Sequence, residues 1–484
     1  MQPSVVLIII SLYSLVLFYI AFHTGKNQSN ANFFVAKKQS PWLVVAYGMI
    51  GASLSGVTFM SVPGWVGDTH FKYLMVVVGY LIGYAVIALV LMPLYYRLNL
   101  TTIYTYLDER FGTWSHKTGS FFFILSRTIG ASFRIYLVVH VLQTFVFDAW
   151  HVPFIVTIIL FLALVILYTY RGGIKTIIWT DTLQTTFMLL AVVVSIFLIL
   201  KEMNMSFGQL VQNVWHSELS QVMDYDINSR QYYWKQLISG AFIAIAMTGL
   251  DQEMMQKNLS IRTLKDAQKN MFSFSVALFF VNLMFLFLGA ALYVLVESKG
   301  IALPKSSDDL FPMIAIQYLS PLAGIVFIVG LISAAYPSAD GALTSLTTAF
   351  SIDFLALDKK ENLSEKQAQN IRHKVHLVFA FILFLVIYIF SLINDRAVID
   401  KLFTVAGYTY GPLLGLFAFG ILSKRKVKDS IVPFIAVLSP VICYFISEYS
   451  TVLFNGYKIG FELLLLNGLI TFVGLFFISV RRRK

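Results

Sequence analysis

Charged residues are scarce in this chain of 484 residues. They make up 13% of it, against about a quarter in an average soluble domain, whereas apolar residues make up 58% and the mean hydropathy is +0.76. This balance excludes a water-soluble fold. Cysteine is almost absent as well, because the single Cys443 lies in an apolar run and cannot form an internal disulfide.

Long apolar runs are what the sequence has in abundance. Runs of about 18 or more residues, long enough to cross a hydrocarbon core of about 30 Å, recur along the whole chain. They predict an all-α integral membrane protein in which residues 1–484 form a single transmembrane domain. Thirteen spans are predicted, at residues 4–23, 41–66, 73–96, 118–145, 153–170, 176–200, 236–256, 272–296, 320–350, 375–393, 399–422, 431–448 and 460–480. The first run has no basic segment before it and no small-residue cleavage site, so a retained helix is expected.

The net charge of +11 is a topology signal. Most of the 36 Lys and Arg residues fall in alternate loops or tails, including Lys38, Lys257, Lys359 and residues 481–484. The positive-inside rule then places the C-terminus in the cytoplasm and, with an odd number of spans, the N-terminus outside. A multi-pass protein of the plasma membrane is predicted, in contact with the lipid bilayer and not with nucleic acid.

Small and hydroxyl-bearing residues interrupt the second span. They crowd residues 48–58 in mid-membrane, and Pro63-Gly64 follow. Irregular backbone at this depth is tolerated only where it lines a cavity or contacts protein, so the stretch predicts a broken helix beside a binding site. The seventh span, with Ser239-Gly240 and Thr248-Gly249, would be its counterpart in an inverted repeat. The alternative for both is close helix packing through small residues.

Two carboxylates are predicted to lie inside the membrane. Asp181 lies near the start of the sixth span with Gln184 one turn on, and Asp340 lies in the middle of the ninth span, after Pro337. A charge at the bilayer centre costs from about 3 to more than 10 kcal/mol, so each carboxylate needs a reason. Sodium binding is one reason. The alternatives are an interhelical hydrogen bond for Asp181 and a pair with a buried arginine for Asp340.

Two arginines, Arg127 and Arg134, are predicted inside the fourth span. They are seven residues apart and therefore share one face of the helix. Either could bind a carboxylate of the solute with two hydrogen bonds. A structural pair with Asp340 or with helix-terminal carbonyls is the open alternative for each. Arg134 is predicted to lie deeper, which favours it as the residue that binds an anionic solute.

Four strings of residues, taken in order, resemble the sodium:solute symporters, the family that includes the sodium/glucose, proline and sialic acid transporters. They are Leu54-Ser55-Gly56-Val57-Thr58-Phe59, Gly172-Gly173 leading to Trp179-Thr180-Asp181 and Gln184, Gly249-Leu250-Asp251-Gln252 with Gln256-Lys257, and Ala334-Ala335 to Ser338 with Ser345. The resemblance covers nearly the whole chain. It implies a LeuT-like core of five plus five inverted helices, with a first repeat at 41–200 and a second at 236–422. One extra helix at 4–23 precedes the core, and two at 431–480 follow it.

The resemblance also implies where sodium binds. The positions that match the main sodium site of relatives are Gly51, Leu54, Ala334 and Ser338. Pro337 stands where relatives usually carry a further hydroxyl ligand. Some relatives bind a second sodium, and the matching positions here are Asp181, Asp340 and Ser338. Sodium, as one or two ions, is therefore the expected coupling ion.

The solute is expected beside the break in the second span. The resemblance implies contacts with Ser53, Ser55 and Thr58, to which Arg134 is added as the candidate for an anion. The arginine that binds the sialic acid carboxylate in relatives matches Gly130 here, so sialic acid is not supported by that residue.

Together these features predict a sodium-coupled symporter that imports a small polar organic solute by alternating access. Proton coupling through Asp181 or Asp340 is the alternative within transport, and a transporter-like sensor is the alternative outside it. An enzyme is not expected, because the eight histidines are scattered and no nucleophile, base or metal cluster converges. The residues do not identify the solute.

Overall fold

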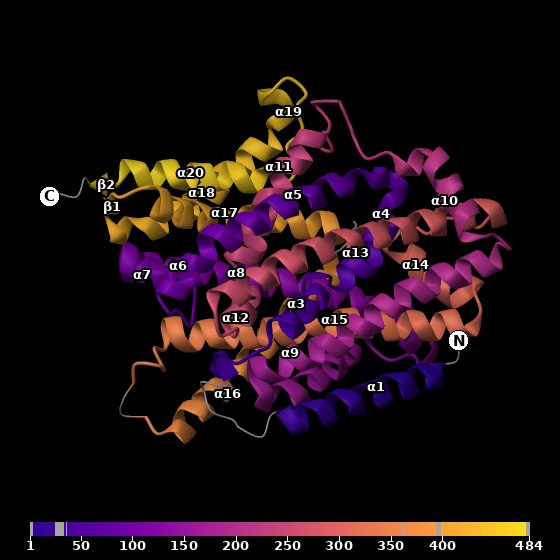
Figure 1. The fold of residues 1–484 in the computed structure, drawn as a ribbon, viewed down its shortest axis with the longest axis horizontal. Coiled ribbons are helices and arrows are strands. Elements are labelled where there is room, and N and C mark those ends of the chain that lie inside the picture. The colour runs from indigo at the N-terminus through magenta and orange to yellow at the C-terminus, as the bar shows by residue number, and fades with distance from the viewer. Residues whose placement is uncertain (1–2, 25–32, 35, 361–362, 394–397, 481–484) are drawn as a thin grey trace.

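The computed structural model describes residues 3–24, 33–34, 36–360, 363–393 and 398–480. The basic cluster at 481–484 lies outside the described residues. Within them the regular structure is helical apart from one short antiparallel strand pair, β1 (Lys426–Val427) with β2 (Ser479–Val480). The long helices run side by side along one direction of the bundle (Figure 1).

Each predicted span contains a helix. In chain order these helices are α1 (Pro3–Thr24), α3 (Trp42–Ser53), α4 (Gly56–Thr69), α5 (Tyr73–Val86), α6 (Met92–Arg97), α8 (Thr113–Leu142), α9 (Phe154–Glu202), α11 (Tyr233–Ala244), α12 (Gln252–Leu259), α13 (Leu264–Lys299), α15 (Pro321–Ala349), α16 (Glu365–Ile393), α17 (Val398–Leu422), α18 (Val432–Glu448) and α20 (Leu463–Phe477). Four short helices connect them: α7 (Thr105–Arg110), α10 (Phe207–His216), α14 (Leu310–Met313) and α19 (Ser450–Leu453).

Nine helical segments among the described residues are long and apolar enough to cross a membrane, and three shorter apolar helices lie at Trp42–Ser53, Phe154–Thr169 and Leu463–Phe477. The helical turns continue through α9, but the backbone leaves helical geometry at Gly173 (φ 56°, ψ −156°). The kink separates the spans predicted at 153–170 and 176–200. The all-α membrane fold is confirmed, whereas the count of thirteen and the repeat boundaries stay predictions.

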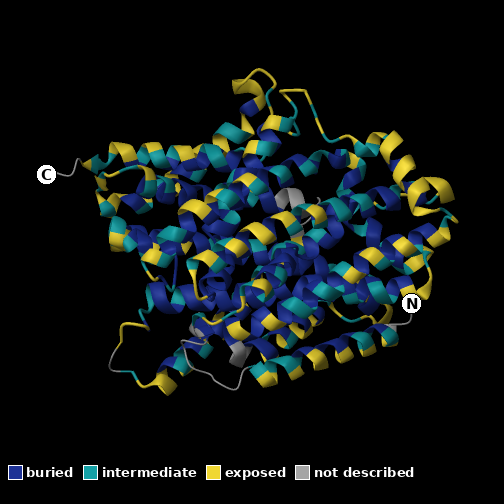
Figure 2. Ribbon diagram, viewed as in Figure 1, coloured by how far each residue is buried: buried dark blue, intermediate teal, exposed yellow. Residues whose placement is uncertain are grey.

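Apolar side chains cover the outside of the bundle, as expected where lipid replaces water as the solvent. On α1, Leu12 is 59% exposed and Phe22 is 69% exposed, and Phe477 at the end of α20 is 81% exposed. Soluble monomers rarely expose contiguous apolar surface on this scale. Figure 2 shows buried residues filling the centre of the bundle and exposed residues along its outer helices.

The centre of the bundle is built by helices that are far apart in the sequence. α15 packs along α9 and also contacts α3, α4 and α8, while α3 packs on α9 and α13. α1 lies at one edge of the bundle, and α18 and α20 lie at the opposite edge (Figure 1). These outer helices leave α3, α4, α12 and α15 in the interior.

One predicted interruption of the seventh span is wrong. Ser239-Gly240 lies within the regular helix α11. A Cβ on Gly240 would lie 2.1 Å from the carbonyl oxygen of Val76, so the missing side chain allows α11 to contact the backbone of α5. Ser239-Gly240 thus fits the alternative given for the small residues of this span, which is close helix packing in place of a helix break. The helix instead ends after a π-helical turn at Ile245–Gly249.

Candidate functional site: two helix breaks, a cavity and buried charges

The chain leaves helical geometry between α3 and α4, as the small residues of the second span predict. Leu54 (φ −87°, ψ 90°) and Ser55 (φ −81°, ψ 180°) are extended between the two helices. A second break precedes α12, where Asp251 (φ −104°, ψ 122°) accepts a hydrogen bond from the amide of Met254 at 3.2 Å. Backbone groups freed at such breaks need partners inside a membrane.

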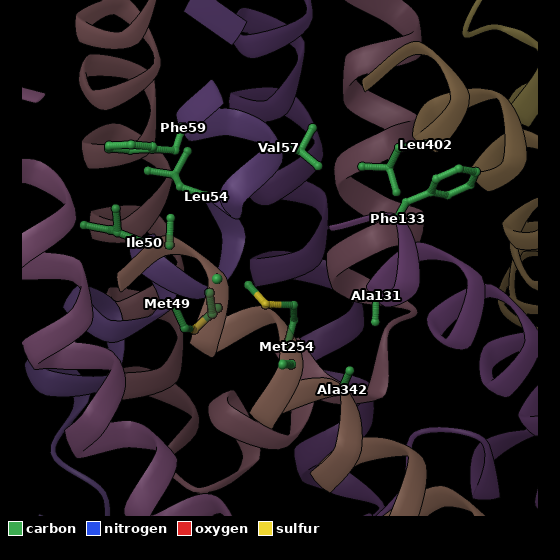
Figure 3. Close-up of a cluster of buried hydrophobic side chains, with 14 of the residues drawn as sticks. Met49, Ile50, Leu54, Val57, Phe59, Ala131, Phe133, Met254, Ala342 and Leu402 are labelled. Carbon is green, nitrogen blue, oxygen red and sulfur yellow. The ribbon is translucent and has the colours of Figure 1, made fainter. Parts of the chain in front are cut away.

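A cavity of about 80 Å³ lies beside the first break. All four residues predicted to contact the solute line it: Ser53, Ser55, Thr58 and Arg134. Three tyrosines of α5 that the sequence reasoning missed, Tyr73, Tyr80 and Tyr84, also line it. Figure 3 shows the apolar side chains of this region, with Leu54 and Val57 at the break, Met254 on α12 and Leu402 on α17.

The two arginines of α8 have different surroundings. Arg127 is 5% exposed, forms an ion pair with Glu253, and has its Nη1 atom 3.9 Å from Asp251 Oδ2. Arg127 is therefore a structural ion-pair residue and not a free binder of an anionic solute, and its partners are Glu253 and Asp251 and not Asp340. Arg134 is 9% exposed, and among the described residues it has neither an ion pair nor a hydrogen bond.

Asp181 is fully buried and forms an interhelical ion pair. Its Oδ2 atom accepts a hydrogen bond from Lys257 Nζ at 2.7 Å, and Lys257 also lies 3.6 Å from Glu253 Oε1. The prediction that Lys257 belongs to a cytoplasmic loop is wrong. The second part of the broken seventh helix, α12, carries Lys257 into the interior, where the two carboxylates offset the cost of burying its charge.

Several buried oxygens of α9, α12 and α15 have no hydrogen-bond partner among the described residues. Asp340 Oδ2 accepts a hydrogen bond from Tyr168 at 2.8 Å, and among the described residues the alternative of a pair with a buried arginine is not found. Asp340 Oδ1, Asp181 Oδ1 and Ser338 Oγ are among the unpartnered atoms. Unpartnered buried polar atoms are rare in native proteins. All three belong to the residues predicted for a second sodium, and carboxylate and hydroxyl oxygens are hard ligands that fit a small cation.

The residues predicted for the main sodium site belong to α3, its C-terminal end and α15, and these two helices pack on each other and on α9. Gly51 donates its amide hydrogen to Thr185 Oγ1 at 3.0 Å, and a Cβ on Gly51 would lie 2.3 Å from that atom. Ala334 and Ser338 are fully buried on α15, four residues and so about one turn apart. The backbone carbonyls at the C-terminal end of α3, near Leu54, are oxygens of the kind that sodium binds. The hydroxyl of Ser338 on α15 is another.

Glu253 and Tyr410 extend the charged cluster, and sequence reasoning found neither Glu253 nor the contact of Tyr410 with Asp251. Tyr410 of α17 donates to Asp251 Oδ2 at 2.6 Å, and Glu253 connects Arg127 to Lys257. The signal in the sequence was the spacing of Glu253 and Lys257, since residues four apart meet on one face of a helix.

The chain belongs to the sodium:solute symporter family, because the profile of that family matches residues 33–429. This confirms the resemblance seen in the four strings of residues and sets the chain among transporters, not enzymes. Among similar curated proteins, the human sodium/iodide cotransporter is 26% identical over 83% of this chain and 63% of its own length. The sodium/sialic acid symporter SiaT of Proteus mirabilis is 24% identical over 88% of this chain and 87% of its own length. The chain thus spans slightly under two thirds of the first relative and most of the second.

Solved structures show the same fold. A substrate-bound outward-open structure of a sodium-coupled sialic acid symporter superposes with a TM-score of 0.81 at 18% identity, over 99% of each chain. Mhp1, a nucleobase-cation-symport-1 family transporter, superposes with a TM-score of 0.56 at 13% identity, over 93% of this chain and 94% of that one. At these identities the likeness establishes the LeuT-like fold.

Proposed function

We propose that this protein is a sodium-coupled symporter that imports a small polar organic solute by alternating access. The observation that carries the proposal is the position of the broken helix α3–α4: it lines a cavity at Ser53, Ser55 and Thr58, and it also packs against α15, where Ser338 Oγ is buried without a partner. One helix break thus serves both a solute cavity and an ion site. The sodium-coupled relatives support this assignment.

The main sodium ion would be bound by Gly51, Leu54, Ala334 and Ser338, between the end of α3 and α15. A second ion would be bound by Asp181, Asp340 and Ser338, each of which keeps an unpartnered buried oxygen. Each sodium that moves inward through 100 mV gains about 2.3 kcal/mol, so a second ion would roughly square the attainable accumulation of solute.

Sodium would couple to the solute through one conformational equilibrium. An ion between α3 and α15 fixes the break, and the fixed break completes the solute cavity, so ion and solute favour the same state. The ion pairs of α12 with Asp181 of α9 and Arg127 of α8 would keep the other end of the pathway closed. By the charge distribution, that end faces the cytoplasm, the C-terminus is cytoplasmic and the N-terminus is outside.

The relatives leave the solute open. The relatives include cotransporters of iodide and sialic acid and, in Xenopus laevis, a sodium-coupled monocarboxylate transporter, and these solutes differ in size and shape. At about a quarter identical residues, the similarity to these relatives does not identify which of these solutes this protein binds.

The ion is tested by thermal unfolding of the purified protein in sodium, potassium and choline buffers at fixed pH, because a ligand stabilises the state that it binds. Sodium should raise the unfolding temperature, and Ser338→Ala should weaken the apparent sodium affinity by roughly tenfold, as expected for one ligand hydroxyl. If the unfolding temperature instead changes with pH and not with sodium, proton coupling through Asp181 or Asp340 would replace this proposal.

A further inference from the structure

Arg134 is a cation in the wall of the solute cavity, and among the described residues it has no anion as an ion-pair partner. Arg134 is 9% exposed and lines the cavity, and its Nε atom has no hydrogen-bond partner among the described residues. No carboxylate of the described residues lies within ion-pair distance of it. Burying an unmatched charge is costly, and proteins ordinarily pair it. The missing partner is therefore expected to come from outside the protein.

Arg127 provides an internal comparison on the same helix face. It lies in the same cavity wall, but Glu253 and Asp251 match its charge. Asp251 is itself engaged, because its carboxylate accepts hydrogen bonds from Tyr410 at 2.6 Å and from the amide of Met254 at 3.2 Å. Of the two arginines, only Arg134 is left to bind an anion.

The remaining walls limit the rest of the solute. The cavity volume of about 80 Å³ favours a small solute. Apolar side chains line much of it, including Ile243, Met247, Leu402 and Phe403. A short apolar body with one negative charge fits these walls. A dianion would bring a second charge for which the described walls offer no free cation.

We propose that the solute is a small organic monocarboxylate, with its carboxylate bound by Arg134 and its apolar body packed against α11 and α17. This rests on the proposed transport function and names its substrate class. Arg134 is then a binding residue that specifies the charge of the solute. Guanidinium groups bind carboxylates through two parallel hydrogen bonds, so the planar anion is preferred over a spherical one.

The test is ligand binding to the purified full-length chain, measured as thermal stabilisation in constant sodium. The probes are acetate, propionate, lactate and benzoate, with propionamide as the neutral match of propionate, succinate as a dianion and iodide as an inorganic anion. The variants are Arg134→Met and Arg134→Lys, and Lys299→Gln is the control because Lys299 is an exposed residue at the end of α13.

We expect at least one monocarboxylate to stabilise the protein, and propionamide and succinate to have no effect. Arg134→Met should weaken that binding by roughly 10- to 100-fold, because hydrogen bonds to a charged group are lost. The affinity of Arg134→Lys should lie between those of Arg134→Met and the unchanged protein. Lys299→Gln should bind as the unchanged protein does. Equal binding in Arg134→Met, an equal effect of propionamide, iodide as the sole ligand, or no effect of any monocarboxylate would each overturn the proposal.

The same binding experiment separates failure of sodium coupling from failure of the monocarboxylate proposal. A monocarboxylate that binds through Arg134 equally well in sodium and potassium would keep the substrate class and remove sodium coupling. Sodium-dependent binding of a neutral solute would keep the symporter and remove the monocarboxylate.

Discussion

Removal of the positive charge should have opposite consequences at Arg127 and Arg134. In Arg127→Met, Glu253 keeps only Lys257 at 3.6 Å, and that ammonium is already hydrogen-bonded to Asp181 at 2.7 Å. Loss of one partner of a buried ion pair costs about 3–5 kcal/mol. Arg134→Met breaks no ion pair, so its unfolding free energy in the absence of solute should change by less than about 1 kcal/mol or increase.

Thermal unfolding in detergent, in potassium and without solute, measures this difference. An unfolding entropy of about 2.1 cal/mol/K per residue gives about 1 kcal/mol/K for the whole chain, so Arg127→Met should lower the unfolding temperature by roughly 3–5 °C. Replacing Glu253 by Met in the same protein should recover part of the loss, because the unpaired carboxylate is removed as well.

Similar shifts of the unfolding temperature for the two single variants would contradict the difference in pairing between Arg127 and Arg134. A large loss in Arg134→Met would mean that Arg134 is a structural ion-pair residue, and its role in binding the solute would fall with it. The absence of recovery in the double variant would show that Glu253 is not the partner that makes Arg127 necessary.

The remaining predictions concern the second ion and the helix packing. Asp340→Asn should lower the Hill coefficient for sodium from about 2 to about 1 in a binding titration, whereas a coefficient that stays near 2 would remove Asp340 from the ion site. Gly240→Ala should destabilise the protein by about 1–3 kcal/mol, because its Cβ would meet the Val76 carbonyl at 2.1 Å. Gly208 lies on the exposed α10, where an added Cβ would have no atom within 4 Å, so Gly208→Ala should be neutral or stabilising by up to about 1 kcal/mol. Equal losses of stability in the two variants would contradict a packing role for Gly240.

The fold and the first helix break were predictable because both depend on local sequence. A membrane span is defined by the composition of about 20 consecutive residues. The break at Leu54-Ser55 follows from the crowding of small residues around it, which offer little side-chain packing to hold a continuous helix. The kink of α9 at Gly173 is local in the same way, since only glycine adopts that backbone easily.

The charged cluster was not predictable because it depends on which helices meet. Lys257 lies 76 positions from Asp181, and position in a basic segment made it look like a loop residue. Likewise, the sequence assigns Arg127 and Arg134 to one helix face, yet the fold of α12 supplies Glu253 to Arg127 alone. The difference between a structural and a binding arginine appears once the helices are packed.

Sodium-driven solute uptake can be measured as transport into proteoliposomes that contain the purified protein. Labelled propionate would be supplied outside under an inward sodium gradient, an equal inward potassium gradient, or an inward proton gradient without sodium. We expect accumulation above equilibrium with the sodium gradient alone. This accumulation should be reduced in Ser338→Ala and lost in Arg134→Met. Accumulation with the proton gradient, or equal uptake with sodium and potassium, would contradict sodium-driven uptake.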